Sequence, residues 1–110
     1  MTRDIYERLK DVARAGRTIT YGEISPMADL NMSKPPDRNE IGRLLGTICA
    51  REHEEGRPLL SAVVVRSNIG CPGKGFFTLA QELGIYDGSD DKAFWIEEVR
   101  RVHEHWKKAE

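Results

Sequence analysis

The sequence lacks long apolar runs, is poor in cysteine and carries almost no net charge, and each absence excludes a class of protein. No stretch approaches the roughly 20 apolar residues that a membrane-spanning helix requires. The charged residues of the N-terminus run straight into an amphipathic segment, so we expect no signal peptide. Two cysteines among 110 residues are too few for a disulfide framework. These features predict a cytoplasmic protein with reduced thiols and no membrane contact.

The composition is that of one folded domain. Hydrophobic residues make up 39% of the chain and charged residues 32%, which is typical of a globular protein. A length of 110 residues suits a single domain over 1–110. The formal net charge of −1 counts against nucleic-acid binding, because phosphate neutralisation usually requires a basic protein.

Apolar periodicity predicts an α+β domain with about five helices. Its order is helix, short helix, helix, strand, glycine-rich loop, helix, helix, and the longer segments are 4–15, 37–56, the strand 59–66, 76–83 and a last helix from Asp90 or Asp91. Two capping boxes are predicted, one from Thr20 to Glu23 and one from Asp37 to Glu40. This order of elements matches a winged helix-turn-helix, in which two helices and a turn are followed by a strand or hairpin with a flexible loop.

Three segments make that plan more specific. Thr18-Ile19-Thr20-Tyr21-Gly22-Glu23-Ile24 resembles the T-x-x-Y-G-E-[IL] segment of the alkylguanine-DNA alkyltransferases and alkyltransferase-like proteins. Asn39–Gly46 resembles the start of their recognition helix, and Pro58–Val65 stands where they carry P-C-H-R-V-V. The resemblance covers about half of the chain and implies a DNA-binding winged helix-turn-helix.

The same alignment implies that the chemistry of that family is missing. Ser61 takes the place of the alkyl-accepting cysteine and Ala62 that of its histidine, and a thiolate is needed for alkyl transfer. We therefore predict no catalytic residues. The intercalating arginine of the family falls on Asn39, with Arg38 beside it, while Tyr21 matches the tyrosine that acts on the phosphate of the flipped nucleotide.

With Arg43 on the first turns of the same predicted helix and Lys74 in the glycine-rich loop, the candidate nucleic-acid contacts are Tyr21, Arg38, Asn39, Arg43 and Lys74. The alternative is a solvated helix face on which Arg43 pairs with a nearby glutamate. The loop with Gly70, Gly73 and Gly75 is a candidate anion-binding loop. Its alternative is a tight connection that needs glycines for positive φ.

Other residues favour structural roles. Cys49 and His53 are four residues apart, but we predict a core thiol and a surface imidazole, with no metal and no cofactor. Trp95 and Trp106 share a stripe that predicts packing against the first helix, or a homodimer or protein interface if it is exposed.

We therefore predict a non-enzymatic DNA-binding domain. The alternative from another class is a protein–protein interaction module, and a third is an enzyme using Ser61 or Cys71.

Overall fold

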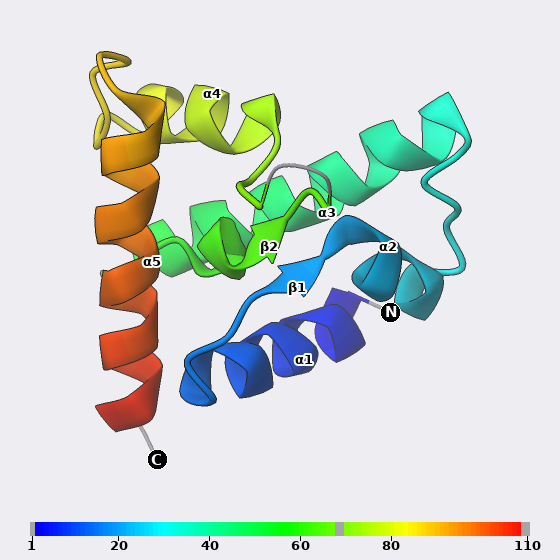
Figure 1. Ribbon diagram of the computed structural model, residues 1–110, viewed down its shortest axis with the longest axis horizontal. Helices are drawn as coiled ribbons and strands as arrows, with labels where there is room; N and C mark the ends of the chain where they lie inside the picture. The colour runs from blue at the N-terminus through cyan, green and yellow to red at the C-terminus, as the bar shows by residue number, and fades with distance from the viewer. Residues whose placement is uncertain (1, 68–69, 109–110) are drawn as a thin grey trace.

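The computed structural model describes residues 2–67 and 70–108, which form five α-helices, two 3-10 helices and one small sheet (Figure 1). The elements in chain order are α1 (Thr2–Arg14), β1 (Ile19–Thr20), α2 (Tyr21–Ile24), η1 (Ser25–Ala28), α3 (Pro35–Glu54), η2 (Leu60–Val63), β2 (Val64–Val65), α4 (Lys74–Glu82) and α5 (Asp91–Lys108). Within these ranges no helix combines the length and the apolar character that crossing a bilayer requires.

The sheet consists of two short parallel strands, with Ile19 opposite Val64 and Thr20 opposite Val65. The strand predicted over 59–66 is therefore correct only at its C-terminal end. Residues 60–63 form the 3-10 helix η2 instead, because β1 offers only two residues to pair with. The apolar run is nevertheless buried as predicted, since a run of this kind does not by itself distinguish a strand from another buried segment.

The segment 59–65 lies at the centre of the molecule and is buried throughout. The helices α1, α3 and α5 all contact η2. In Figure 1 the long helix α5 runs down one side of this segment, α1 lies below it and α3 behind it. All five α-helices contribute buried or partly buried apolar side chains to one core. The surrounding helices therefore take their positions from this central segment.

Side chains of α5 fix the backbone of the central segment. The carboxylate of Glu98, which is 2% exposed, accepts a hydrogen bond from the backbone N–H of Leu59 at 2.8 Å. Arg101 donates to the same carboxylate at 3.0 Å. Three residues further along the segment, the carbonyl of Ala62 accepts a hydrogen bond from the indole N–H of Trp95 at 2.8 Å. These contacts satisfy polar groups that burial would otherwise leave unpaired.

A second buried carboxylate holds the chain that leads into this segment. Glu52 is 0% exposed, and its two oxygens accept from Arg57 at 2.7 and 3.1 Å. Gly56 lies between the two with a φ of +76°, a left-handed conformation that glycine adopts without strain. The ion pair therefore turns the end of α3 back toward the core.

The helix starts agree in part with the predicted caps. Thr20 and Glu23 form the predicted capping box. The second predicted box is wrong: α3 begins at Pro35, after Lys34 as N-cap, because proline at the first position already has helical φ and lacks the N–H that would need a cap. Asp37 instead accepts from the backbone N–H of Asn31 at 2.9 Å.

The last two helices begin close to their predicted starts. α4 begins at Lys74, two residues before the predicted Phe76, with Gly73 as its N-cap. Asp90 caps α5, since its side chain accepts from the backbone N–H of Ala93 at 3.0 Å. The prediction of an aspartate cap at this point is confirmed.

The tryptophan stripe of α5 lies against the fold. Trp106 is 6% exposed, and the side-chain charges of Lys10 and Arg14 from α1 lie 5.7 and 5.9 Å from the centre of its ring. Packing against the first helix is thus confirmed for Trp106. Trp95 is half-buried and contacts η2 instead. A homodimer or protein interface through this stripe stays a prediction, which only the partly exposed Trp95 could serve directly.

We expect Glu98→Ala to lower the free energy of unfolding by about 2–3 kcal/mol, because it leaves the buried N–H of Leu59 without an acceptor. Glu98→Gln keeps an oxygen at this position and costs less. Urea denaturation measures both. As a control, Glu104→Ala removes an exposed carboxylate of the same helix, which we expect to change stability by no more than about 0.5 kcal/mol. Equal losses for Glu98→Ala and Glu104→Ala would contradict this role.

Candidate functional site

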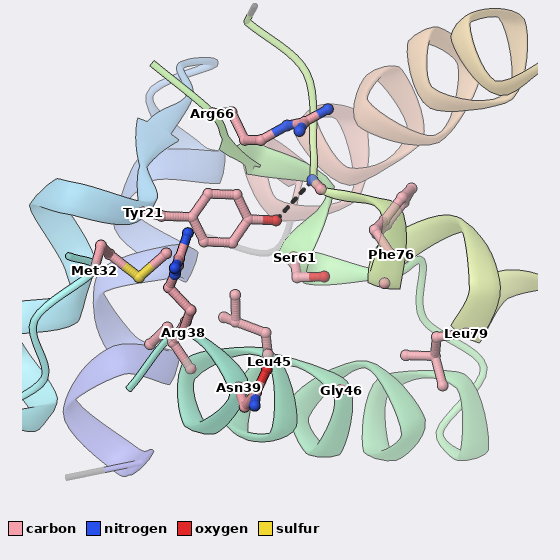
Figure 2. Close-up of a pocket in the computed structure, with 14 residues that line it drawn as sticks. Tyr21, Met32, Arg38, Asn39, Leu45, Gly46, Ser61, Arg66, Phe76 and Leu79 are labelled. Atoms are coloured by element: carbon pink, nitrogen blue, oxygen red, sulfur yellow. Dashed lines mark hydrogen bonds between the residues drawn. The ribbon is translucent and has the colours of Figure 1, made fainter. Parts of the chain in front are cut away.

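A pocket of about 420 Å³ opens between α3, the β1–α2 junction and the start of α4 (Figure 2). α3 forms its floor, Tyr21 reaches in from one side, and Ser61 and Phe76 close the back. This volume falls within the range of small-molecule sites. The lining combines apolar side chains with a few polar ones: Tyr21, Met32, Arg38, Asn39, Ile41, Gly42, Leu45, Gly46, Ser61, Arg66, Gly73, Gly75, Phe76 and Leu79.

The pocket brings together three of the five predicted nucleic-acid contacts, namely Tyr21, Arg38 and Asn39. Arg43 lies elsewhere on α3, where its guanidinium pairs with the carboxylate of Glu40. The pairing with a nearby glutamate that the alternative predicted is therefore present, and a nucleic-acid contact by Arg43 stays a prediction. Lys74 is exposed and lines a second pocket on the other side of the glycine-rich loop.

Tyr21 is held in place by the loop that faces it. Its hydroxyl oxygen accepts a hydrogen bond from the backbone N–H of Gly73 at 2.9 Å, which leaves the O–H proton available to a ligand. Burial raises the pKa of Tyr21 above its ordinary value of 10.0, so the phenol stays neutral at physiological pH. A Cβ at Gly73 would lie 3.3 Å from the hydroxyl. Glycine therefore permits the close approach of the two segments.

Ser61, in the place that the alignment gives to a catalytic cysteine, faces the pocket from η2. Its hydroxyl lies 2.8 Å from the thiol of Cys49. Within the described residues its side chain thus contacts a thiol, and no histidine or carboxylate of the kind that activates a serine nucleophile hydrogen-bonds to it. Cys49 itself is 0% exposed, and desolvation raises the pKa of the thiol from 9.0 to about 11. It is the core thiol that the sequence predicted.

Two arginines give the pocket its charge. Arg38 and Arg66 are exposed at its edge and form no ion pair within the described residues. Arg66 was missed by the sequence analysis, although its place directly between a buried strand and a glycine-rich loop is typical of binding residues. Guanidinium groups without a carboxylate partner are available to phosphate or carboxylate ligands.

The glycine-rich loop is closed by its own backbone. The N–H of Arg66 donates to the carbonyl of Cys71, and the N–H of Gly70 donates to the carbonyl of Arg66, both at 2.8 Å. Gly70 has a φ of +67°, which favours glycine. Because the N–H of Gly73 is bonded to Tyr21, neither Gly70 nor Gly73 offers a backbone donor to an anion. Gly75 lies in the first turn of α4.

The remaining candidates stay apart from one another. Within residues 2–67 and 70–108 there is no group of three His, Cys, Asp or Glu side chains that could hold a metal ion. His53 is half-buried on α3 and Cys71 is half-buried in the loop. The two cysteines are unpaired thiols.

The chain matches no protein-family model, no curated protein and no solved structure. The interpretation of the pocket therefore depends on its own geometry.

The Cys49 thiol makes stability depend on pH in the alkaline range. The folded protein favours the neutral thiol up to a pKa of about 11, whereas the unfolded chain ionises near 9.0. The stabilisation is complete below pH 9 and is lost as pH rises toward 11, on the order of 2–3 kcal/mol. Chemical denaturation at pH 8 to 10.5 measures it.

Two variants isolate this effect. Cys49→Ala lowers stability at pH 8 but flattens the decline above pH 9. Cys71→Ser retains the decline of the wild-type protein, because it leaves the buried thiol in place. Parallel pH profiles for Cys49→Ala and the wild type would show that Cys49 is not the group responsible.

Proposed function

We propose that this domain binds DNA without catalysing a reaction, and that the pocket beside α3 receives an unpaired base. The observation that carries this proposal is the convergence of Tyr21, Arg38 and Asn39 on one cavity. The neutral O–H of Tyr21 and the amide of Asn39 are hydrogen-bonding groups that suit a base edge. Phe76 and Leu79 supply the apolar wall that a planar base requires.

The order of the elements supports a winged-helix-like interpretation of the fold. The short helix α2 and the turn η1 precede the long helix α3, and β2 is followed by a glycine-rich loop, of which the structure describes 66–67 and 70–73. In this proposal the N-terminal turns of α3 face the duplex and the loop acts as the wing. Segments that resemble the alkyltransferase-like proteins lie at α2, at α3 and at η2, so the resemblance and the pocket involve the same parts of the chain.

The distribution of charge supports the same face. Part of the acidic charge is paired with neighbouring arginines, as on the outer face of α5, where Glu97 and Glu104 both bind Arg100. By contrast, Arg38 and Arg66 beside the pocket have no ion-pair partner within the described residues. A local excess of basic charge of this kind allows phosphate binding at a net charge near zero.

A separate observation favours the alternative, a protein-interaction module. Ile85 and Ile96 are the exposed large hydrophobic residues, at 37% and 50% exposure. Ile85 lines a shallow cavity that also includes Asp87, Asp90 and Glu97, whereas Ile96 lies outside that lining. An apolar surface bordered by acidic side chains suits a basic peptide.

We expect Arg38→Ala and Arg66→Ala each to weaken binding of a labelled duplex by roughly three- to tenfold at low salt, because each removes a free guanidinium. Each also lowers the slope of log K against log salt concentration by about 0.9 if it removes one phosphate contact. Arg43→Ala has a smaller effect, since Glu40 already holds its charge. Fluorescence anisotropy over a salt series measures all three.

The matched control is Arg51→Ala, which removes an exposed arginine about 20 Å further along the same helix. We expect it to bind like the wild type. Lys74→Ala tests the far side of the loop in the same assay. Absence of binding by the wild-type protein at low salt, where electrostatic attraction is strongest, would overturn the DNA proposal and favour the protein-interaction module.

Filling the pocket separates base capture from binding to the DNA backbone. Gly42 lines the pocket from α3, and a Cβ added there meets no atom within 4 Å. Gly42→Leu therefore fills space while raising helix propensity by up to about 1 kcal/mol, so we expect no loss of thermal stability. A duplex with one extrahelical base should lose its affinity advantage over a fully paired duplex.

Thr47→Leu is the control, because it adds the same side chain to an exposed position of α3 outside the pocket. It should retain the preference for the extrahelical base. Retention of that preference by Gly42→Leu as well would show that the base does not enter this pocket.

A further inference from the structure

A second cavity, of about 530 Å³, lies on the other side of the glycine-rich loop from the pocket described above. The loop contributes Gly70, Cys71 and Pro72 to it, whereas α4 and α5 supply the opposite walls. Arg66 borders both cavities. The residues that line the second cavity are Arg66, Gly70, Cys71, Pro72, Lys74, Phe77, Asp91, Lys92 and Trp95.

This cavity has an excess of positive charge. Three cations line it, Arg66, Lys74 and Lys92, against the single carboxylate of Asp91. Within the described residues none of the three cations forms an ion pair, and Asp91 accepts a hydrogen bond from the hydroxyl of Tyr86. Cations from three separate elements that border one cavity favour an anionic ligand with several oxygens.

The same cavity has an aromatic wall. Trp95 is half-buried, and the bond from its indole N–H to the carbonyl of Ala62 fixes the orientation of the ring. Phe77 also lines the cavity; it is 7% exposed and packs edge-to-face on Phe76 with the ring centres 5.2 Å apart. A rigid aromatic surface next to clustered cations suits a planar ring that carries a phosphate, since stacking and charge act on different parts of the ligand.

We propose that this second cavity binds a nucleoside monophosphate group, with the phosphate held by Lys74, Lys92 and Arg66 and the base against Trp95. The two cavities share only Arg66 at their border, and this proposal does not depend on DNA binding in the pocket beside α3. A free mononucleotide and a nucleotide within a single strand carry the same chemistry, so both are sources of the ligand.

The test uses the fluorescence of Trp95. Trp106→Phe leaves Trp95 as the one tryptophan of the chain, and adenosine 5′-monophosphate is titrated against this variant. We expect saturable quenching by the nucleotide and at least tenfold weaker effects of adenosine and of inorganic phosphate, which each lack one half of the ligand. Equilibrium dialysis with the wild-type protein gives an affinity that does not depend on the Trp106→Phe substitution.

Lys92→Ala should weaken the affinity for the nucleotide by roughly five- to tenfold. Its control is Lys107→Ala, an exposed lysine near the other end of α5, which should bind like the wild type. Equal affinities for all three proteins, or no saturable binding in dialysis, would overturn the proposal. Equal binding of phosphate and nucleotide would also overturn it, because it would reduce the site to an anion site.

Two further titrations separate this site from its neighbour and identify the source of the ligand. Gly42→Leu fills only the pocket beside α3 and should leave the nucleotide affinity unchanged. If this variant lost affinity for the nucleotide, the claim of a second site would be overturned. A single-stranded adenine hexanucleotide that competes with the mononucleotide supports a strand as ligand, and no competition supports a free nucleotide.

Discussion

The position of the buried segment 59–65 depends on the carboxylate of Glu98. An apolar run without strand partners at its N-terminal end has backbone groups that must find acceptors inside the core. Glu98 supplies one to Leu59, and Trp95 supplies a donor to Ala62. Both side chains belong to α5, so these two hydrogen bonds hold that helix against the central segment. With the segment fixed, β2 pairs with β1 and Ser61 faces the pocket beside α3.

A net charge near zero has a different meaning once the ion pairs are known. Many of the charged side chains on α1 and α5 pair with neighbours three or four residues away. Such pairs contribute little to stability individually. They do, however, leave the cations around the two cavities as an uncompensated group. A total charge averages over these regions and therefore underestimates the field at the cavities.

Most of the secondary structure follows from the sequence, because its signals are local. The helix periodicities, the Thr20–Glu23 box and the aspartate cap of α5 are interactions between residues a few positions apart. The Asp37–Glu40 box fails because Pro35 starts the helix earlier. The strand fails at residues 60–63 because strand pairing is decided by a partner far along the chain, and that partner offers two residues.

The site was predictable only in its parts. Tyr21, Arg38 and Asn39 follow from the alignment with a known family, and the structure places all three around one cavity. Arg66 and the hydrogen bond from Gly73 to Tyr21 depend on which segments meet in space, which periodicity does not encode. The ion pair of Arg43 with Glu40 joins residues three apart on one helix, so the sequence predicted it as the alternative to a ligand contact.

The parallel pairing of Ile19 with Val64 has a kinetic consequence. It closes a loop of 45 residues, at an entropic cost of about 3 kcal/mol. Contacts of such high sequence separation form late in folding and slow it, whereas α1, α3 and α5 form from local contacts. The walls of the pocket beside α3 come from both ends of this loop, since residues 21–46 face residues 61–79. The pocket therefore forms only when these two parts of the chain have met, and the helices that local contacts build do not by themselves create the cavity.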